Sequence, residues 1–306
     1  MLKARHKDLH PLLKVAEWLL VMIVCTAAVF AVWRVLPINH ASTGALLLFQ
    51  GLQAFGVFII PAICMRYLWG IQQPTAISGQ PSVVSHQRSG LLALLGVGIM
   101  VTAIPLINSM VAWNESIRLP ESLRGLEQWI QQTEAQAELL LQGFLTYKNG
   151  AWQVLLLNLL VLAILPGIGE ELAFRGVLQS VISGQQSAVS RQHIAIWVTA
   201  FVFSFVHFQF YGFIPRLLLG ALFGYVLLWS GQLGPCMLMH ATNNALSVLA
   251  FYLGTYRWHL SQAEIDAIGT QHTWWLTLVC TPVMLLLIYL FRRIAVGSQP
   301  STTGNQ

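Results

Sequence analysis

Long apolar runs that recur along the whole chain constrain its fold most strongly. Several of them reach or approach ~20 residues, the length that an α-helix needs to cross a hydrocarbon core ~30 Å thick. Charged residues make up only 9% of the chain, against about 25% in soluble domains. The weakly alternating segments of ~10 residues that build a membrane β-barrel are absent from the sequence. The sequence therefore predicts an all-α, polytopic transmembrane helical bundle.

The apolar runs predict about eight spans in a single integral membrane domain that covers residues 1–306. No internal repeat is evident in the sequence. The predicted spans are residues 12–35, 44–67, 90–113, a fourth that begins at about residue 152 and precedes a turn at 183–187, and then 193–210, 213–230, 236–253 and 274–290.

Two segments differ in character from the spans. Residues 114–150 form the one long hydrophilic stretch, and residues 123–145 within it carry apolar side chains at helical spacing among Glu and Gln. We expect an amphipathic helix here, lying on the membrane or over the protein. A surface helix without a catalytic role is favoured over a lid. The Ser, Thr, Gly and Gln residues of 294–306 predict a flexible tail.

The distribution of lysine and arginine predicts the orientation in the membrane. With a cytoplasmic N-terminus, ten of these residues fall on the cytoplasmic side and six on the other, which together make the sixteen in the chain. This bias predicts that both termini are cytoplasmic. The net charge of +5 needs no nucleic acid to explain it. The chain has no long targeting extension, and we therefore expect a multi-pass protein of the bacterial inner membrane.

The fourth predicted span carries three charges, Glu170, Glu171 and Arg175. A charge near the bilayer centre costs ~3 kcal/mol, so three within six residues call for an explanation. On a helix, Glu171 and Arg175 share a face and can neutralise each other, whereas Glu170 is turned away from Glu171 by ~100°. Glu170 is therefore predicted to find its partner on another helix.

Two further polar clusters lie in apolar surroundings. Phe203 and His207 are one helical turn apart in the fifth span, and His240 and Asn244 are one turn apart in the seventh. A lone histidine in a membrane helix is more often a packing residue than a catalyst. Lipid, however, offers polar groups no partners, so clusters on three helices are expected to converge inside the bundle.

The chemistry that such a cluster could perform is restricted. Glu with His suits the activation of a water molecule as general base, and His with Asn suits the stabilisation of an oxyanion. Together they predict hydrolysis of an acyl bond, with peptide as the natural substrate. Glu170, His207 and His240 could instead hold a zinc ion, because two His and one Glu with water form a known catalytic set. The sequence has no HExxH motif, so a metal site would be assembled across helices, and the metal-free and zinc alternatives stay open.

The three motifs together resemble those of the CAAX-protease and bacteriocin-processing family of intramembrane proteases. Glu170-Glu171-x-x-x-Arg175, Phe203-x-x-x-His207 and His240-x-x-x-Asn244 stand in the family's order on successive apolar segments. The resemblance covers about residues 152–253. It implies a helical-bundle endopeptidase in which the residues have these roles: water activation for Glu170 and His207, oxyanion stabilisation for His240 and Asn244, and support for Glu171, Arg175 and Phe203.

The resemblance leaves the substrate and the class of protein partly open. The expected partners are the lipid bilayer and a peptide or protein substrate, lipidated or membrane-associated. One alternative is a non-enzymatic membrane adaptor or bacteriocin-immunity-type protein that keeps the polar cluster for folding or binding. An ion-coupled transporter is a second alternative, since intramembrane Glu and His also serve as proton relays. It is less favoured, because the sequence has no paired broken helices in two halves.

Overall fold

Each long apolar run of the sequence forms a helix in the computed structural model, which describes residue 6 and residues 9–70, 86–184 and 189–297. The regular structure of these residues is helical throughout, with no strand among them. The predicted all-α bundle is confirmed. In chain order the elements are α1 (Pro11–Val35), α2 (Thr43–Gln53), η1 (Ala54–Ile59), α3 (Ile60–Leu68), α4 (His86–Glu115), η2 (Glu121–Leu123), α5 (Arg124–Thr146), η3 (Tyr147–Gly150), α6 (Trp152–Asn158), η4 (Leu159–Ile164), α7 (Leu165–Ala173), η5 (Phe174–Gln179), α8 (Ser180–Ser183), α9 (Val189–Phe205), α10 (Phe213–Ser230), α11 (Leu233–Tyr256), α12 (Gln262–Asp266), η6 (Gln271–Thr273) and α13 (Trp274–Gly297).

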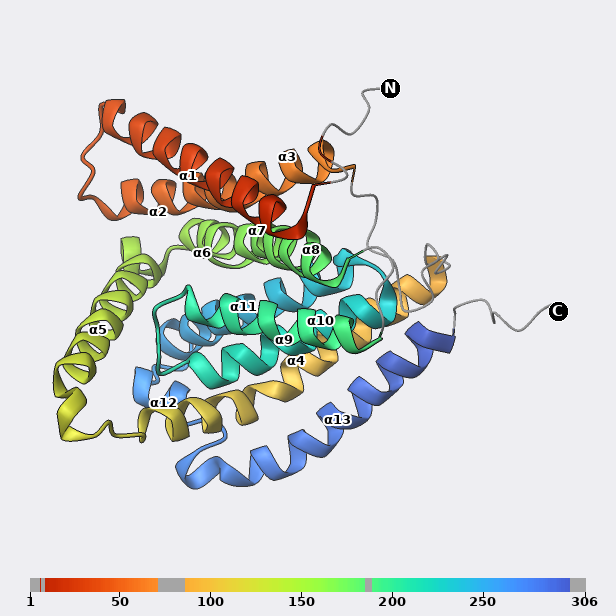
Figure 1. Ribbon diagram of the computed structural model, residues 1–306. Helices are drawn as coiled ribbons and strands as arrows, with labels where there is room; N and C mark the ends of the chain where they lie inside the picture. The colour runs from red at the N-terminus through yellow and green to blue at the C-terminus, as the bar shows by residue number, and fades with distance from the viewer. Residues whose placement is uncertain (1–5, 7–8, 71–85, 185–188, 298–306) are drawn as a thin grey trace.

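The helices surround α7 and α11, which lie side by side near the middle of the bundle (Figure 1). α1, α2 and α3 cover the helix that runs from α6 to α8 on one side, and α9, α10 and α11 lie on its other side. α4 and α13 pack along each other beyond α10 and α11, while α5 and α12 stand at one flank. Residues from distant parts of the sequence therefore meet at α7.

The fourth predicted span is one continuous helix with two wide turns. α7 lies between the π-helical segments η4 and η5, and the whole helix runs from Trp152 to Ser183. Such π-helical turns are rare and are frequently found at functional sites. A Cβ on Gly167 would lie 2.8 Å from the backbone nitrogen of Ala241 in α11, and one on Gly169 would lie 3.1 Å from Phe58 in η1. Glycine therefore allows α7 to approach both neighbours closely.

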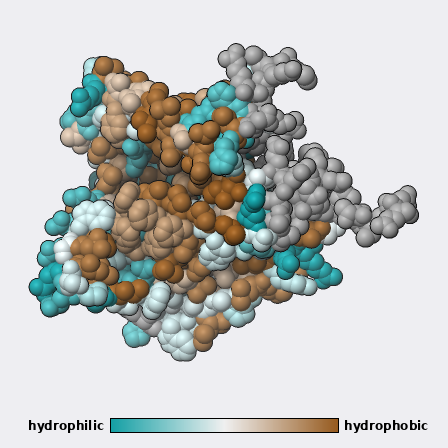
Figure 2. Space-filling view, viewed as in Figure 1, coloured by the Kyte–Doolittle hydropathy of each residue, from teal (hydrophilic) through white to brown (hydrophobic). Residues whose placement is uncertain are grey.

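The helices agree with most of the predicted spans. Within the part of the chain that the structure describes, six are long and apolar enough to cross a membrane, which identifies an integral, multi-pass membrane protein. α9 and α11 lie at the fifth and seventh predicted spans but are not among the six, so the count of eight is not confirmed. The apolar outer surface agrees with burial in lipid, since α1 buries only Trp18 (Figure 2).

Two predicted boundaries are wrong. The sequence predicts a fifth span that ends at residue 210, whereas α9 ends at Phe205 because the chain turns back there toward α10. It also predicts a flexible tail that begins at residue 294, whereas α13 continues to Gly297, with Ala295 packed in the core. The remainder of that tail lies outside the described residues.

The close contact between α7 and α11 gives a test of the packing. Gly167→Ala should lower the free energy of unfolding by ~1–3 kcal/mol, because the added methyl group meets the backbone of Ala241. The measurement is unfolding of the purified protein in detergent, followed by tryptophan fluorescence. Gly143→Ala is the matched control, since its methyl group meets nothing within 4 Å and alanine favours a helix by ~0.5–1 kcal/mol. Equal stability of the two variants would contradict the packing assignment.

Candidate active site

A fully buried ion pair lies at the centre of the site. Arg175 Nη1 donates to Glu171 Oε1 over 2.7 Å, and neither side chain is exposed to solvent. Arg175 Nη2 donates to the carbonyl oxygen of Gly220 over 2.8 Å, which ties α7 and η5 to α10. The rings of Phe203 and Phe223 lie 4.7 and 5.4 Å from the guanidinium carbon. Such cation–π contacts help to compensate a buried charge for its lost hydration.

The ion pair also orients His240. Glu171 Oε1 accepts a second hydrogen bond, of 2.8 Å, from His240 Nδ1. The imidazole stacks on Phe223, with ring centroids 5.6 Å apart. These contacts turn His240 Nε2 toward Glu170, whose Oε2 lies 3.8 Å away.

His207 approaches the same carboxylate from the connection between α9 and α10. Its Nδ1 lies 2.6 Å from the carbonyl oxygen of Phe203, which can only accept, so Nδ1 carries a proton. Its Nε2 lies 3.7 Å from Glu170 Oε2. His207 is outside the six candidate spans, and burial with the nearby positive charge of Arg216 lowers its pKa to about 4. The ring is therefore neutral at neutral pH, and Nε2 has a free lone pair.

The backbone beside His207 is strained. Phe208 has a φ of +53°, a conformation that residues other than glycine adopt rarely. Strained residues cluster at active sites, where the surrounding structure holds them in place. Here Asn114 of α4 donates to the carbonyl of Phe210 over 2.8 Å, and Glu134 of α5 accepts from the backbone N–H of Tyr211 over 2.9 Å.

Glu170 thus lies between two imidazole nitrogens, one from α11 and one from the connection between α9 and α10. The distances of 3.7 and 3.8 Å exceed a direct hydrogen bond and suit a bridging water molecule. Glu170 Oε2 is buried and has no hydrogen-bond partner among the described residues. The arrangement leaves Glu170 free to bind a polar molecule, whereas both partners of Glu171 Oε1 are protein groups.

Asn244 lies one turn beyond His240 on α11. Its Nδ2 donates to the carbonyl of Leu162 in η4 over 3.3 Å, and its Oδ1 accepts from Asn243 Nδ2 over 3.2 Å. The amide has two N–H donors, so one remains for a ligand. Asn243, Asn244 and His240 all line the same cavity.

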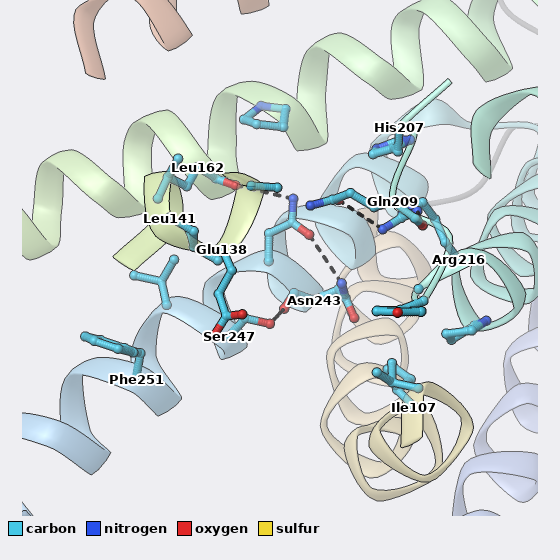
Figure 3. A pocket seen from close by; sticks show the side chains of 18 of the residues that line it. Ile107, Glu138, Leu141, Leu162, His207, Gln209, Arg216, Asn243, Ser247 and Phe251 are labelled. Atoms are coloured by element: carbon cyan, nitrogen blue, oxygen red, sulfur yellow. Dashed lines mark hydrogen bonds between the residues drawn. The ribbon is translucent and has the colours of Figure 1, made fainter. Parts of the chain in front are cut away.

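The cavity has a volume of 1350 Å³ and opens between α4, α5, α10 and α11. This exceeds the ~300–1,000 Å³ of a small-molecule pocket, so a peptide segment has room in it. Figure 3 shows His207, Gln209 and Arg216 on one side and Leu141 and Glu138 of α5 on the other. α5 therefore lies over the protein and lines one wall of the cavity, and its expected lack of a catalytic role stays a prediction.

Among the described residues, no group of three or more His, Cys, Asp or Glu stands close enough together to hold a metal ion. Glu170 Oε2 is nevertheless 3.7 and 3.8 Å from the Nε2 atoms of His207 and His240. Two ligands of a tetrahedral zinc ion, each at ~2.0–2.2 Å from the metal, stand ~3.3–3.6 Å apart. The three side chains thus fit a bridging water molecule as they stand and would hold a zinc ion after a shift of a few tenths of an ångström.

The structure brings together all seven residues of the three sequence motifs. Phe203 lies between the functional groups, with its ring 4.9 Å from His207 and 5.8 Å from His240. Sequence reasoning missed other residues of the cavity. Asn243 stands inside the third motif, and Arg216 is a charge within an apolar run, which is the signal that identified Glu170. The sequence did not reveal the following residues, which line the cavity or hold the turn beside it: Asn114, Glu134, Gln209, Arg216 and Asn243.

Comparison with known proteins agrees with the motifs. Residues 152–246, about a third of the chain, match the model of a family described as "Type II CAAX prenyl endopeptidase Rce1-like". The matched region contains all three motifs, and the resemblance to the CAAX-protease family is confirmed. No curated protein and no solved structure matched the chain.

The contribution of the buried ion pair to the stability of the fold can be tested by substitution. Glu171→Ala should lower the free energy of unfolding by ~3–5 kcal/mol, because the buried guanidinium of Arg175 loses its counter-charge. Detergent unfolding curves provide the measurement. Glu121→Ala is the control, since its pair with Arg124 is exposed and should contribute less than ~1 kcal/mol. A loss at Glu171 no greater than at Glu121 would show that the ion pair is dispensable for folding.

Proposed function

We propose that the chain is an intramembrane endopeptidase that hydrolyses a peptide bond with a water molecule activated by Glu170 and His207. The position of Glu170 Oε2, 3.7 and 3.8 Å from the Nε2 atoms of His207 and His240, carries this proposal. The similarity of residues 152–246 to an endopeptidase family supports it.

The first step is attack by water. Glu170 accepts one proton of the water as its oxygen bonds to the carbonyl carbon, and the free lone pair of His207 Nε2 accepts a hydrogen bond from the other. The C–N bond of the resulting tetrahedral intermediate then breaks. Glu170 returns the proton to the departing amine, so the carboxylate is regenerated.

The developing oxyanion needs donors on the side of α11. The second N–H of Asn244 Nδ2 supplies one. His240 is the second proposed group, because Glu171 Oε1 holds its Nδ1 and its Nε2 is thereby turned to the same side, 3.8 Å from Glu170 Oε2.

The cavity and the apolar surface favour a membrane-associated substrate. The matched family is described as prenyl endopeptidases, and we propose a peptide or protein substrate that carries a lipid or lies at the membrane. We also propose the bacterial inner membrane as the location, cytoplasmic termini and a single domain that covers residues 1–306. Cysteine-accessibility labelling of single-cysteine variants in residues 114–150 and 72–88 would determine the orientation.

Substitution of the two proposed catalytic groups tests the function. Glu170→Gln and His207→Ala should each lower the cleavage rate by about 10²- to 10⁴-fold, because each removes a group that handles the water. The assay uses the full chain in lipid nanodiscs with internally quenched peptides, with and without a prenylated cysteine, and identifies the products by mass spectrometry.

The control for this assay is Glu138→Gln, which removes a carboxylate from the same cavity wall without touching Glu170. Its rate should stay within a few-fold of the unsubstituted chain. Cleavage that persists in folded Glu170→Gln and His207→Ala would refute the assignment. A biological phenotype retained by these variants would favour the non-enzymatic adaptor.

A further inference from the structure

Arg216 places a positive charge in the wall of the cavity next to His207. It is the fourth residue of α10 and lines the cavity together with Gln209 and Glu170. Its side chain is shown beside Gln209 in Figure 3. Unlike Arg175, which is fully enclosed by protein, Arg216 is partly accessible from the cavity.

The guanidinium of Arg216 is held by uncharged groups. Nη1 donates to the backbone carbonyl of Gln209 over 3.0 Å, and Nη2 donates to its Oε1 over 3.2 Å. No carboxylate among the described residues lies within 4.0 Å of the guanidinium. A guanidinium has five N–H donors, so three remain after these two bonds. The fork is thus fixed in orientation but still open to an anion.

Helix stability does not account for Arg216. A positive charge in the first turn of a helix opposes the helix dipole, and α10 begins at Phe213. The chain also makes room for the side chain, because a Cβ on Gly212 would lie 2.9 Å from Arg216 Nη2. These contacts fix the guanidinium in the cavity although its charge opposes the helix dipole.

We propose that Arg216 binds a carboxylate group of the peptide substrate and thereby selects which peptides enter the site. Arginine suits this task because its planar fork matches the two oxygens of a carboxylate. The carboxylate is either the C-terminal group of the peptide or an acidic side chain. This inference rests on the proposed function for its substrate class, but binding can be measured without cleavage.

The test is equilibrium binding of labelled peptides to the full chain in nanodiscs. Three fluorescein-labelled pools of degenerate decapeptides from Ala, Val, Leu, Ser and Gly are compared. The first has a free C-terminal carboxylate, the second is amidated, and the third is amidated with one internal glutamate. Fluorescence anisotropy gives the affinities, and carboxylate preference is the ratio of a charged pool to the amidated pool.

The unsubstituted chain should bind one charged pool about 10-fold or more tightly than the amidated pool, since a hydrogen bond to a charged group contributes ~1.5–3 kcal/mol. Preference for the first pool identifies the terminal carboxylate, and preference for the third identifies a side chain. Arg216→Gln should bring the ratio close to one. Arg118→Gln, which alters an exposed arginine of the same cavity, should leave it unchanged.

Three results would overturn the proposal. They are the absence of carboxylate preference in the unsubstituted chain, its persistence in Arg216→Gln, and an equal loss in Arg118→Gln. A loss of affinity for all pools alike would mean that Arg216 only braces Gln209. If Arg216→Gln does not fold, Gln209→Ala decides, because loss of the brace should lower the preference several-fold and an unchanged ratio would contradict carboxylate binding. If the unsubstituted chain shows carboxylate preference but cleaves no peptide, carboxylate binding by Arg216 is supported and the proposed peptidase function is rejected.

Discussion

The arrangement of the site depends on the burial of Glu171 and Arg175. Two charges removed from solvent are tolerable only when their remaining hydrogen-bonding groups find partners. Glu171 Oε1 accepts from both Arg175 and His240, and Arg175 also donates to the carbonyl of Gly220. The contacts of this one pair therefore tie α7, η5, α10 and α11 together, while Glu171 Oε2 and Arg175 Nε, both buried, have no hydrogen-bond partner among the described residues. His240 of α11 is therefore held in position by its hydrogen bond to Glu171, a buried carboxylate on α7.

Two adjacent glutamates thus have different environments, although the Oε2 atom of each is buried without a hydrogen-bond partner among the described residues. Glu171 points toward α10 and α11, where protein groups occupy its Oε1. Glu170 is turned by ~100° along the same helix and faces the cavity, where its Oε2 has no partner among the described residues. An active carboxylate and a structural carboxylate can therefore stand side by side in the sequence. Helical periodicity alone separates them.

The same periodicity explains how much the sequence could predict. The pair of Glu171 with Arg175 follows from a spacing of four, and the convergence of Glu170 with His207 and His240 follows from the cost of isolated polar groups in lipid. The end of α9 could not be predicted in this way, because apolar residues continue to Phe210 while the backbone turns after Phe205. The helical stretch of the expected tail, residues 294–297, is likewise held by packing.

The contacts that shape the turn after α9 come from distant parts of the chain. Asn114 is 96 residues away from the carbonyl that it binds at Phe210, and Glu134 is 77 residues away from Tyr211. Such pairings leave no periodic signal in a single sequence. Arg216 did leave a signal, as a charge four residues into an apolar run.

In the wide turns on either side of α7, backbone carbonyl groups accept hydrogen bonds from side chains of neighbouring helices. A π-helical turn disrupts the regular ladder of backbone hydrogen bonds and frees a carbonyl for other partners. In η4 the carbonyl of Leu162 accepts from Asn244, and in η5 that of Gly176 accepts from Arg66 over 3.3 Å. The irregular turns thus supply acceptors to α11 on one side and to α3 on the other. Because the two contacts flank α7, they restrict its rotation and hold Glu170 toward the cavity while Glu171 stays inside the bundle.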